Sequence, residues 1–380
     1  MSRTATPRLL RRLNAQRVLD ALRDGDTQRV SELVARTGLS RPTVDAVADD
    51  LVRLGWVAEV AAQVPRRGRP ARSLAFRSDA GHVAAVDIGE GKVRAAVADL
   101  RGDIVAERVR AFDDDDRLPQ IRAAARATLK AAGVAGRDLL AAGVSCTGAM
   151  DAAAGRVIFS DVLPSGFDLA GALRRTLGPA VVIENDCNLA VIGERWRGVA
   201  RGVQDVICVL GGERIGAGIV VGGKLLRGHA GAAGELWFLD AFADQEQGRG
   251  IAQLVRVLAR AEPEAVFEAA RDGDAGALRI VERAADWAGL AIVPMAQLIN
   301  PELVVIGGGV AGAGDVLLEP LRRLVNERVP LPPRIEASPL GARGPLIGAI
   351  RYALDDLEPR LLDRLDEAAQ QRPRASGQSP

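Results

Sequence analysis

Residues 86–94 read VDIGEGKVR: an apolar strand that ends at Asp87, a tight Gly-x-Gly turn, and the start of a second strand. Glycine adopts backbone angles that other residues avoid, so a turn of this kind can bring backbone N–H groups close to a phosphate. Glu90, however, stands in the middle of the turn, where its carboxylate would repel an anion. The stretch leaves three interpretations open: a phosphate loop, a spoiled phosphate loop, or a plain hairpin turn.

The pattern of short strands and glycine turns continues beyond this stretch and occurs twice. Strands are expected over 82–112 and 139–148, with a helix near 117–132 between them, and a strand-to-helix junction at 181–200. Strands with glycine turns begin again at 205–228, followed by helices near 276–298, a buried strand from 303, a helix, a short strand at 333–339 and a last helix from 345. Two such halves predict a two-lobed α/β domain with a cleft between the lobes.

The first 80 residues form a different kind of unit. They carry fifteen Arg, no Lys and nine Asp or Glu, which gives +6, whereas the whole chain carries +1. Helices are expected over 9–23, 29–38 and 39–56. Ser40 is a good N-cap, and Pro42 fits the first turn of the third helix. Apolar residues at helical spacing make one buried stripe on that helix: Val44, Val47, Ala48, Leu51 and Leu54. The order predicts a helix-turn-helix with polar residues at the start of its second helix.

The segment after the third helix predicts a wing. Two strands flank the tip RRGRPAR (66–72), where arginines are crowded together with Gly and Pro. Arginines on such a loop can enter a minor groove or neutralise phosphates. The residues expected to contact DNA are Ser40, Arg41, Thr43, Asp45, Arg66, Arg67, Arg69 and Arg72. The alternative is a surface helical hairpin with a solvated basic loop.

Composition excludes several classes of protein. No apolar run approaches the roughly 18 residues that a membrane span needs, and no apolar segment of the signal-peptide type follows the basic N-terminus. Cys146, Cys187 and Cys208 stand far apart in apolar segments without metal-like spacing, which favours buried free thiols in a reducing compartment. We therefore expect a cytoplasmic protein with no membrane partner.

Five motifs in order carry a resemblance to a family. They are VDIG (86–89), GVSCTGAMDAAAGRV (143–157), IENDCNLAVIGE (183–194), GAGIVVGGKLLRGHAGAAGE (216–235) and INPELVVIGGGVAGAGD (299–315). The order resembles the ROK family, which groups sugar kinases with transcriptional repressors and shares the ATPase-like fold of actin and hexokinase. The resemblance covers about residues 82–357, and a winged helix ending in GRPAR resembles the repressor branch.

The resemblance implies a sugar site. Asp186, in the run Glu184-Asn185-Asp186-Cys187-Asn188, falls on the position of the kinase base, and Glu235 falls on a second sugar-binding carboxylate. Asn185 offers both a donor and an acceptor. A carboxylate at the base position also serves a protein that only binds sugar, because it accepts hydrogen bonds from hydroxyl groups in the ground state. The alternative interpretation is a capped strand-to-helix junction and a surface acid.

The phosphate loops depart from the family. The first kinase loop resembles Asp-x-Gly-Gly-Thr, whereas this chain has Asp87, Gly89, Glu90 and Gly91. In the second loop, Glu213 and Arg214 replace Thr and Gly, among Gly211, Gly212 and Gly216. Two carboxylates would repel a triphosphate, by roughly 4 kcal/mol for a unit pair about 4 Å apart at an effective dielectric of 20. The loops therefore predict a protein that is not an enzyme and uses no nucleotide cofactor.

A metal site is not expected either. The family often has a zinc site formed by a His and a cysteine cluster after the AGE motif, but here Phe238 takes the His position and no cysteine follows. The only histidines are His82 and His229, so the four N or S ligands that zinc needs are missing. Trp237 and Phe238 leave the identity of any ligand open, since an aromatic ring there could stack on a sugar or fill core.

These expectations combine into one hypothesis. The chain is a cytoplasmic, sugar-responsive repressor with a winged helix at 1–78, an effector domain at 82–357 and a polar, partly disordered tail at 358–380. Its partners are operator DNA and a small sugar or sugar derivative, and it assembles as a homodimer or homotetramer so that two winged helices meet two half-sites. Two alternatives remain: an active ATP-dependent ROK kinase with a DNA-binding appendage, and a regulator that has lost its ligand.

Overall fold

The computed structural model describes residues 7–23, 25, 27–60, 72–113, 115–236 and 250–370, and these residues form two compact units. The N-terminal unit comprises residues up to 82, the segment 98–103 and the residues from 354 onward. The two-sheet unit comprises residues 83–97 and 104–353. The mixed α/β fold class was predicted, but the unit boundaries differ from those expected, because a hairpin tip and the end of the chain belong with the N-terminal unit.

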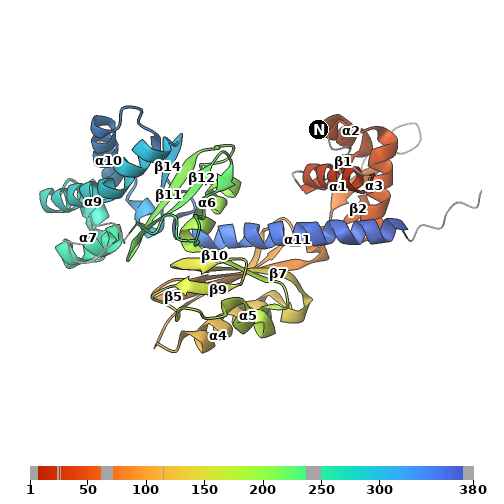
Figure 1. Cartoon of the computed structure of the whole chain (residues 1–380), viewed down its shortest axis with the longest axis horizontal. Helices are drawn as coiled ribbons and strands as arrows, with labels where there is room; N and C mark the ends of the chain where they lie inside the picture. The colour runs from red at the N-terminus through yellow and green to blue at the C-terminus, as the bar shows by residue number, and fades with distance from the viewer. Residues whose placement is uncertain are drawn as a thin grey trace, which may run out of the picture. The chain divides into compact units, whose positions relative to one another are not determined.

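The N-terminal unit is a three-helix group with a small sheet (Figure 1). Its helices are α1 (Pro7–Arg23), α2 (Val30–Thr37) and α3 (Arg41–Arg53), and its strands lie in the order β1 (Thr27–Arg29), β3 (Ser73–Phe76), β2 (Val57–Val60). Gly38 ends α2 with a φ of 67°, which the absence of a side chain allows. Ser40 caps α3 as predicted, and the stripe is buried except for Leu54, which is half-buried. The three-residue β1 was not foreseen.

The end of the chain is helical where a polar tail was expected. Helix α11 runs over Gly344–Gln370, so the prediction is wrong for residues 358–370. Leu361 and Leu365 are buried, and Arg23 and Arg12 of α1 pair with Glu358 and Asp363. The polar composition of this segment belongs to an amphipathic helix whose apolar stripe completes the core of the N-terminal unit. Residues 371–380 lie outside the described residues.

The first sheet of the two-sheet unit has five strands. Their order is β10 (Val181–Asn185), β7 (Leu139–Cys146), β4 (His82–Ile88), β5 (Lys92–Asp99), β6 (Ile104–Ala111), with β10 and β7 parallel. Helices α4 (Arg117–Ala132) and α5 (Leu169–Leu177) lie together on one face of this sheet (Figure 1). A small hairpin of β8 (Ala149–Asp151) and β9 (Arg156–Phe159) follows β7. Neither this β8–β9 hairpin nor helix α5 was predicted.

The second sheet also has five strands, in the order β13 (Lys224–Leu225), β12 (Ile215–Val221), β11 (Val206–Gly211), β14 (Leu303–Gly307), β15 (Arg334–Ala337). Successive side chains on β11 point to opposite faces, as strand geometry requires. Ile207 and Val209 pack with helices α7 (Ile251–Ala259), α8 (Pro263–Arg271), α9 (Ala275–Ile299) and α10 (Asp315–Arg328). Val206 and Cys208 pack with α6 (Asp186–Arg197) on the other face. Helices α7 and α8 were missed.

Candidate functional site

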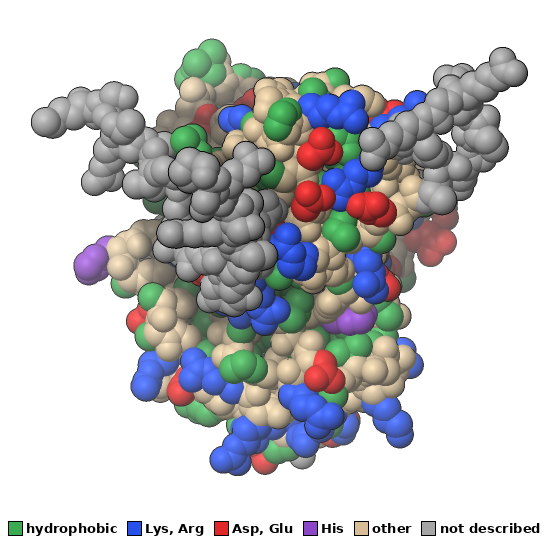
Figure 2. Space-filling model, turned by 90° about the vertical axis from the view of Figure 1, so that its right-hand side faces the viewer, with side chains coloured by type: hydrophobic (Ala, Val, Ile, Leu, Met, Phe, Trp, Pro, Cys, Tyr) green, Lys and Arg blue, Asp and Glu red, His purple; other side chains and the backbone are tan. Residues whose placement is uncertain are grey.

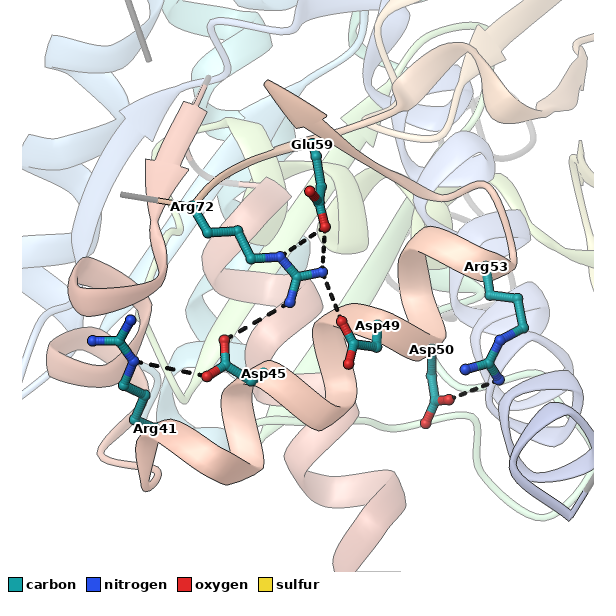
Figure 3. Close-up of polar contacts among 7 residues, drawn as sticks. All are labelled: Arg41, Asp45, Asp49, Asp50, Arg53, Glu59 and Arg72. Carbon is teal, nitrogen blue, oxygen red and sulfur yellow. Dashed lines mark hydrogen bonds and ion pairs between the residues drawn. The ribbon is translucent and has the colours of Figure 1, made fainter. Parts of the chain in front are cut away.

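Four predicted DNA-contact residues lie together at the start of α3. Ser40 and Arg41 are exposed, and Thr43 and Asp45 are half-buried beside the apolar stripe. The hydroxyl groups of Ser40 and Thr43 lie 2.8 Å apart, and both belong to the cap. Arg41 pairs with Asp45 one turn later at 3.7 Å (Figure 3). An exposed i, i+4 pair contributes only about 0.3–0.5 kcal/mol, so Arg41 is free to exchange this partner for a base or a phosphate.

Arg72 has a different environment from the one expected of a wing residue. Its guanidinium group lies between α3 and β2, with Asp49 at 2.7 Å, Glu59 at 2.8 Å and Asp45 at 3.8 Å (Figure 3). Partial burial works to lower the pKa of Arg72, but the hydrogen bonds with Asp49 and Glu59 outweigh it and raise the pKa. Arg72 therefore ties the base of the wing to α3, a role that the sequence did not indicate.

The other three wing arginines, Arg66, Arg67 and Arg69, lie outside the described residues. Figure 2 shows acidic and basic side chains interspersed over the visible face of the molecule. Pairs such as Arg53 with the buried Asp50, at 3.1 Å, have the same alternation of sign (Figure 3). Within the described part of the N-terminal unit, several arginines are paired with nearby carboxylates, as Arg11 and Arg53 are with Asp50.

The strand-to-helix junction brings the predicted sugar-binding residues together. The side-chain oxygen of Asn185 accepts from the Asn188 N–H at 3.0 Å and caps α6, while its amide nitrogen donates to Glu235 at 3.2 Å and to the Gly148 carbonyl at 2.9 Å. Asn185 and Glu235 are 50 residues apart in the chain, so this contact is a product of the fold. The capping interpretation is therefore confirmed for Asn185, and sugar binding by Asn185 stays a prediction.

A buried carboxylate that sequence reasoning passed over supports this junction. Glu184 is 1 % exposed and accepts hydrogen bonds from the Asn188 side chain at 3.0 Å and from Arg227 at 2.6 Å. The half-buried Asp186 is the first residue of α6, and burial raises its pKa while hydrogen bonds to its carboxylate oppose the shift. Glu184 thus links Arg227 to Asn188 in the first turn of α6, the helix that begins at Asp186, and Asp186 lines the cleft.

The first phosphate loop is a closed hairpin turn. The Gly89 N–H donates to the Lys92 carbonyl at 3.0 Å, so it is used within the turn. Asp87 accepts from the Ser145 hydroxyl at 2.7 Å. Burial raises the pKa of Asp87 to about 6, the Ser145 hydrogen bond works against the shift, and the nearby Asp186 adds to it. Asp87, near the end of this strand, is therefore held by the Ser145 hydroxyl.

The two substituted residues of the phosphate loops meet each other. Arg214 of the β11–β12 turn pairs with Glu90 of the β4–β5 turn at 3.2 Å and with Asp161 at 2.8 Å. Burial raises the pKa of Glu90, and the charge of Arg214 works against that rise. We call Glu90, Arg214 and Asp161 the loop bridge. It joins a turn of the first sheet to a turn of the second, at the two positions where the sequence departs from the kinase phosphate loops. Because Glu90 and Arg214 are 124 residues apart, the sequence near either residue does not indicate the pairing.

The substituted carboxylate of the second loop also has an arginine partner within the protein. Glu213 pairs with Arg256 of α7 at 2.7 Å, and Arg256 also contacts Glu262 at 3.3 Å. Two of its glycines serve packing: a Cβ on Gly216 would lie 2.8 Å from the Cys187 sulfur, and one on Gly211 would lie 2.6 Å from Ile251. Gly91 and Gly212 have open space instead. Gly211 and Gly216 are therefore required by packing, whatever these loops bind.

The cleft between these loops has a volume of about 840 Å³. Asn185, Asp186 and Glu235 line one part, and Glu90, Glu213 and Arg214 line another. Among the described residues, no three His, Cys, Asp or Glu side chains are grouped so as to hold a metal ion, and no helix is long and apolar enough to cross a membrane. Trp237 and Phe238 lie outside the described residues. All three cysteines are buried and free, as predicted.

Comparison with known proteins agrees with both units. The model of the ROK family matches residues 83–355, and that of the IclR helix-turn-helix domain matches residues 13–61. A curated relative, the xylose repressor of Caldicellulosiruptor bescii, is 23 % identical over 390 residues, covering 92 % of this chain and 97 % of the relative.

Two solved structures extend the comparison. One is a ROK family transcriptional regulator described as a homologue of the E. coli MLC protein, with a TM-score of 0.75, 22 % identity, and coverage of 94 % of this chain and 99 % of the other. The second is a ROK family glucokinase from Streptomyces griseus with glucose and AMPPNP, with a TM-score of 0.64, 28 % identity, and coverage of 72 % and 100 %. With a family model that spans most of its length, this chain belongs to the ROK family.

Proposed function

We propose that this protein is a sugar-responsive transcriptional repressor. Its winged helix binds operator DNA, and its two-sheet unit binds a small sugar or sugar derivative without phosphorylating it. The observation that carries the proposal is the contrast within one cleft. The amide and carboxylate cluster of Asn185, Asp186 and Glu235 is assembled, while the loops that would hold a triphosphate are joined to each other by the loop bridge.

The similar proteins support this choice. The xylose repressor from Caldicellulosiruptor bescii matches almost the whole chain, including the helix-turn-helix, whereas the glucokinase structure matches only the two-sheet part. A sugar that prefers one arrangement of the two sheets shifts the population of DNA-competent molecules by its difference in affinity for the two arrangements. We propose Asp186 and Glu235 as the residues whose contacts with sugar hydroxyls provide that difference.

The DNA contacts are proposed from the start of α3. Arg41 and Thr43 reach base edges, Asp45 accepts from a cytosine amino group, and Arg66, Arg67 and Arg69 contact phosphates or the minor groove. Arg72 contributes less than these three, because it is held by Asp49 and Glu59. Two such units on one homodimer or homotetramer would match two half-sites.

The test uses operator fragments selected from genomic DNA with the purified full-length protein. Fluorescence anisotropy would be followed while a panel of pentoses, hexoses and their derivatives is added, and a coupled assay would follow ATP consumption. We expect one sugar to release the DNA and no turnover of ATP. Turnover at about 1 s⁻¹ or faster with a common sugar would establish the kinase alternative. DNA binding that no sugar changes would favour the ligand-independent regulator.

A further inference from the structure

A second concave surface, separate from the cleft, lies where α4 and α5 end on the first sheet. Its volume is about 540 Å³. Five basic side chains line it: Arg122, Arg126, Lys130, Arg137 and Arg175. We call this surface the basic pocket. None of the residues assigned to DNA or sugar binding belongs to it, so neither proposed activity explains the accumulation of charge.

The local structure gathers these side chains from three elements. Arg122, Arg126 and Lys130 follow one another at i, i+4 and i+8 on one face of α4. Arg137 comes from a short 3₁₀ turn (Gly136–Asp138), and Arg175 comes from the last turn of α5. The turn packs closely against α5, because a Cβ on Gly136 would lie 2.1 Å from the Thr176 carbonyl oxygen. The pocket therefore has a fixed backbone floor.

The positive charges of the pocket have few intramolecular partners. Arg122 donates to the Ala172 carbonyl at 2.7 Å, and Arg126 donates to the Arg122 carbonyl at 3.2 Å. Both acceptors are neutral backbone groups, so these hydrogen bonds leave the positive charge of each arginine unbalanced. Arg137 approaches Asp138 at 3.8 Å, and both side chains are exposed. Across the described residues, Lys130 and Arg175 have no carboxylate within ion-pair distance. This contrasts with Arg72 and Arg214, which are each bound by two or more carboxylates.

Helix ends alone do not account for five cations. A helix C-terminus carries about half a negative charge, and one basic residue in the last turn is enough to offset it. The ends of α4 and α5 together with Asp138 therefore balance about two of the five. The remaining charges lie close together on a concave surface, where they repel one another unless an anion binds between them.

We infer that the basic pocket binds a small polyanion, a metabolite with two or more phosphate groups. Its volume lies within the range of small-molecule sites, about 300–1,000 Å³. No aromatic side chain is among the residues that line it, so it lacks the stacking surface that single-stranded nucleic acid uses. Several arginines and a lysine around one concavity fit the spaced oxygen atoms of a diphosphate or triphosphate.

The test is isothermal titration calorimetry of the full-length protein with pyrophosphate and with tripolyphosphate. Sulfate, which carries a single anionic group, is titrated for comparison. We expect saturable binding at one site per chain and a Kd below about 1 mM for tripolyphosphate. The double variant Lys130→Ala/Arg175→Ala should weaken this binding about tenfold or more, because two exposed cations are removed from the site. Both side chains are exposed, so the fold should be unaffected, as circular dichroism and thermal unfolding would verify.

Two controls distinguish binding at the basic pocket from nonspecific attraction of anions to the protein surface and from binding at the wing. The variant Arg201→Ala/Lys224→Ala removes the same charge from exposed positions of the same unit and should change the Kd less than about twofold. Saturating operator DNA should leave the pocket's binding in place. Equal weakening by both double variants, displacement of all bound tripolyphosphate by DNA, or no saturable binding up to about 10 mM would each overturn the inference.

Discussion

The two ends of the cleft differ in how much of a sugar kinase they keep. At one end Asn185 both caps α6 and donates to Glu235, so the contacts that would receive a sugar are assembled. At the other end Glu90 and Arg214 occupy the turns that would receive phosphates and pair with each other. The difference teaches that the side chains at the predicted sugar site and those at the predicted phosphate loops form separate sets, so that one set can change without the other.

The strongest test of the sugar end is Asp186→Asn. Loss of a charged acceptor for a sugar hydroxyl should cost about 1.5–3 kcal/mol, which raises the sugar concentration needed to release DNA roughly 10- to 150-fold. Fluorescence anisotropy titrations with and without the inducing sugar measure the DNA affinity and the sugar concentration needed for release. DNA binding without sugar should stay as in the parent, and an unchanged inducer response would show that Asp186 does not bind the sugar.

A variant outside the cleft keeps this comparison interpretable. Arg41→Ala should cost about 1–3 kcal/mol in operator affinity and relax the base preference, since Arg41 is exposed at the start of α3. Its inducer response should be unchanged relative to its own DNA affinity. Arg72→Ala serves as the matched control, expected to weaken the N-terminal unit more than DNA binding. A folded Arg41→Ala protein with the parent's affinity and selectivity would refute the assignment.

The pH dependence of stability tests the environment of Asp87, at the end of the strand that leads into the first loop. Its pKa is raised to about 6 in the folded protein, so the folded state holds a proton that the unfolded chain has released. This contribution to stability is fully present below the unfolded pKa of about 3.9 and is lost as the pH rises through about 6. Denaturant unfolding between pH 4 and pH 7 should show a loss of about 2 kcal/mol from this group, since a difference of one pKa unit corresponds to about 1.4 kcal/mol.

The control for this titration is Asp87→Asn. It should flatten the slope of stability against pH without removing it, because burial also raises the pKa of the neighbouring Asp186. Ser145, Lys92 and Arg94 also face Asp87, and they remain in the variant. An unchanged slope in Asp87→Asn would mean that Asp87 titrates near its ordinary pKa.

The smallest effect is expected at the loop bridge. Glu90 and Arg214 are each about one third exposed, so Glu90→Gln should lower the free energy of unfolding by less than about 1 kcal/mol. It should nevertheless tighten binding of an ATP analogue, since one repelling carboxylate is gone. Asp161→Asn, on the outer side of Arg214, is the matched comparison. A stability loss of several kcal/mol would show that the bridge is a principal support of the cleft.

Much of the architecture was predictable because it depends on residues close together in the chain. The cap at Ser40, the left-handed Gly38 and the apolar stripe of α3 follow from short-range chemistry. The order of strands and glycine turns gave the two sheets, and the phosphate loops could be read as altered from Glu90, Glu213 and Arg214 themselves. The hairpin after β7 and helices α7 and α8 were missed because their segments are short: the two helices have nine residues each, and short apolar segments are ambiguous in sequence.

The tail shows the limit of local reasoning. Leu354, Leu357, Leu361 and Leu365 recur at helical spacing, but the polar composition of the segment favoured an irregular tail. Only the core of the N-terminal unit, which buries this stripe, makes the helix favourable, since most of the stability of a helix in a protein comes from the packing of its apolar face.

The sequence by itself determined the two kinds of unit, the family, and the identity of the groups available at each site. The tertiary structure decided what those groups contact: Arg214 with Glu90, Arg72 with Asp49 and Glu59, and five cations around one pocket. The physical reason is that charge and hydrogen-bonding capacity belong to a residue, whereas the partner that satisfies them depends on which distant segments the fold brings within a few ångströms.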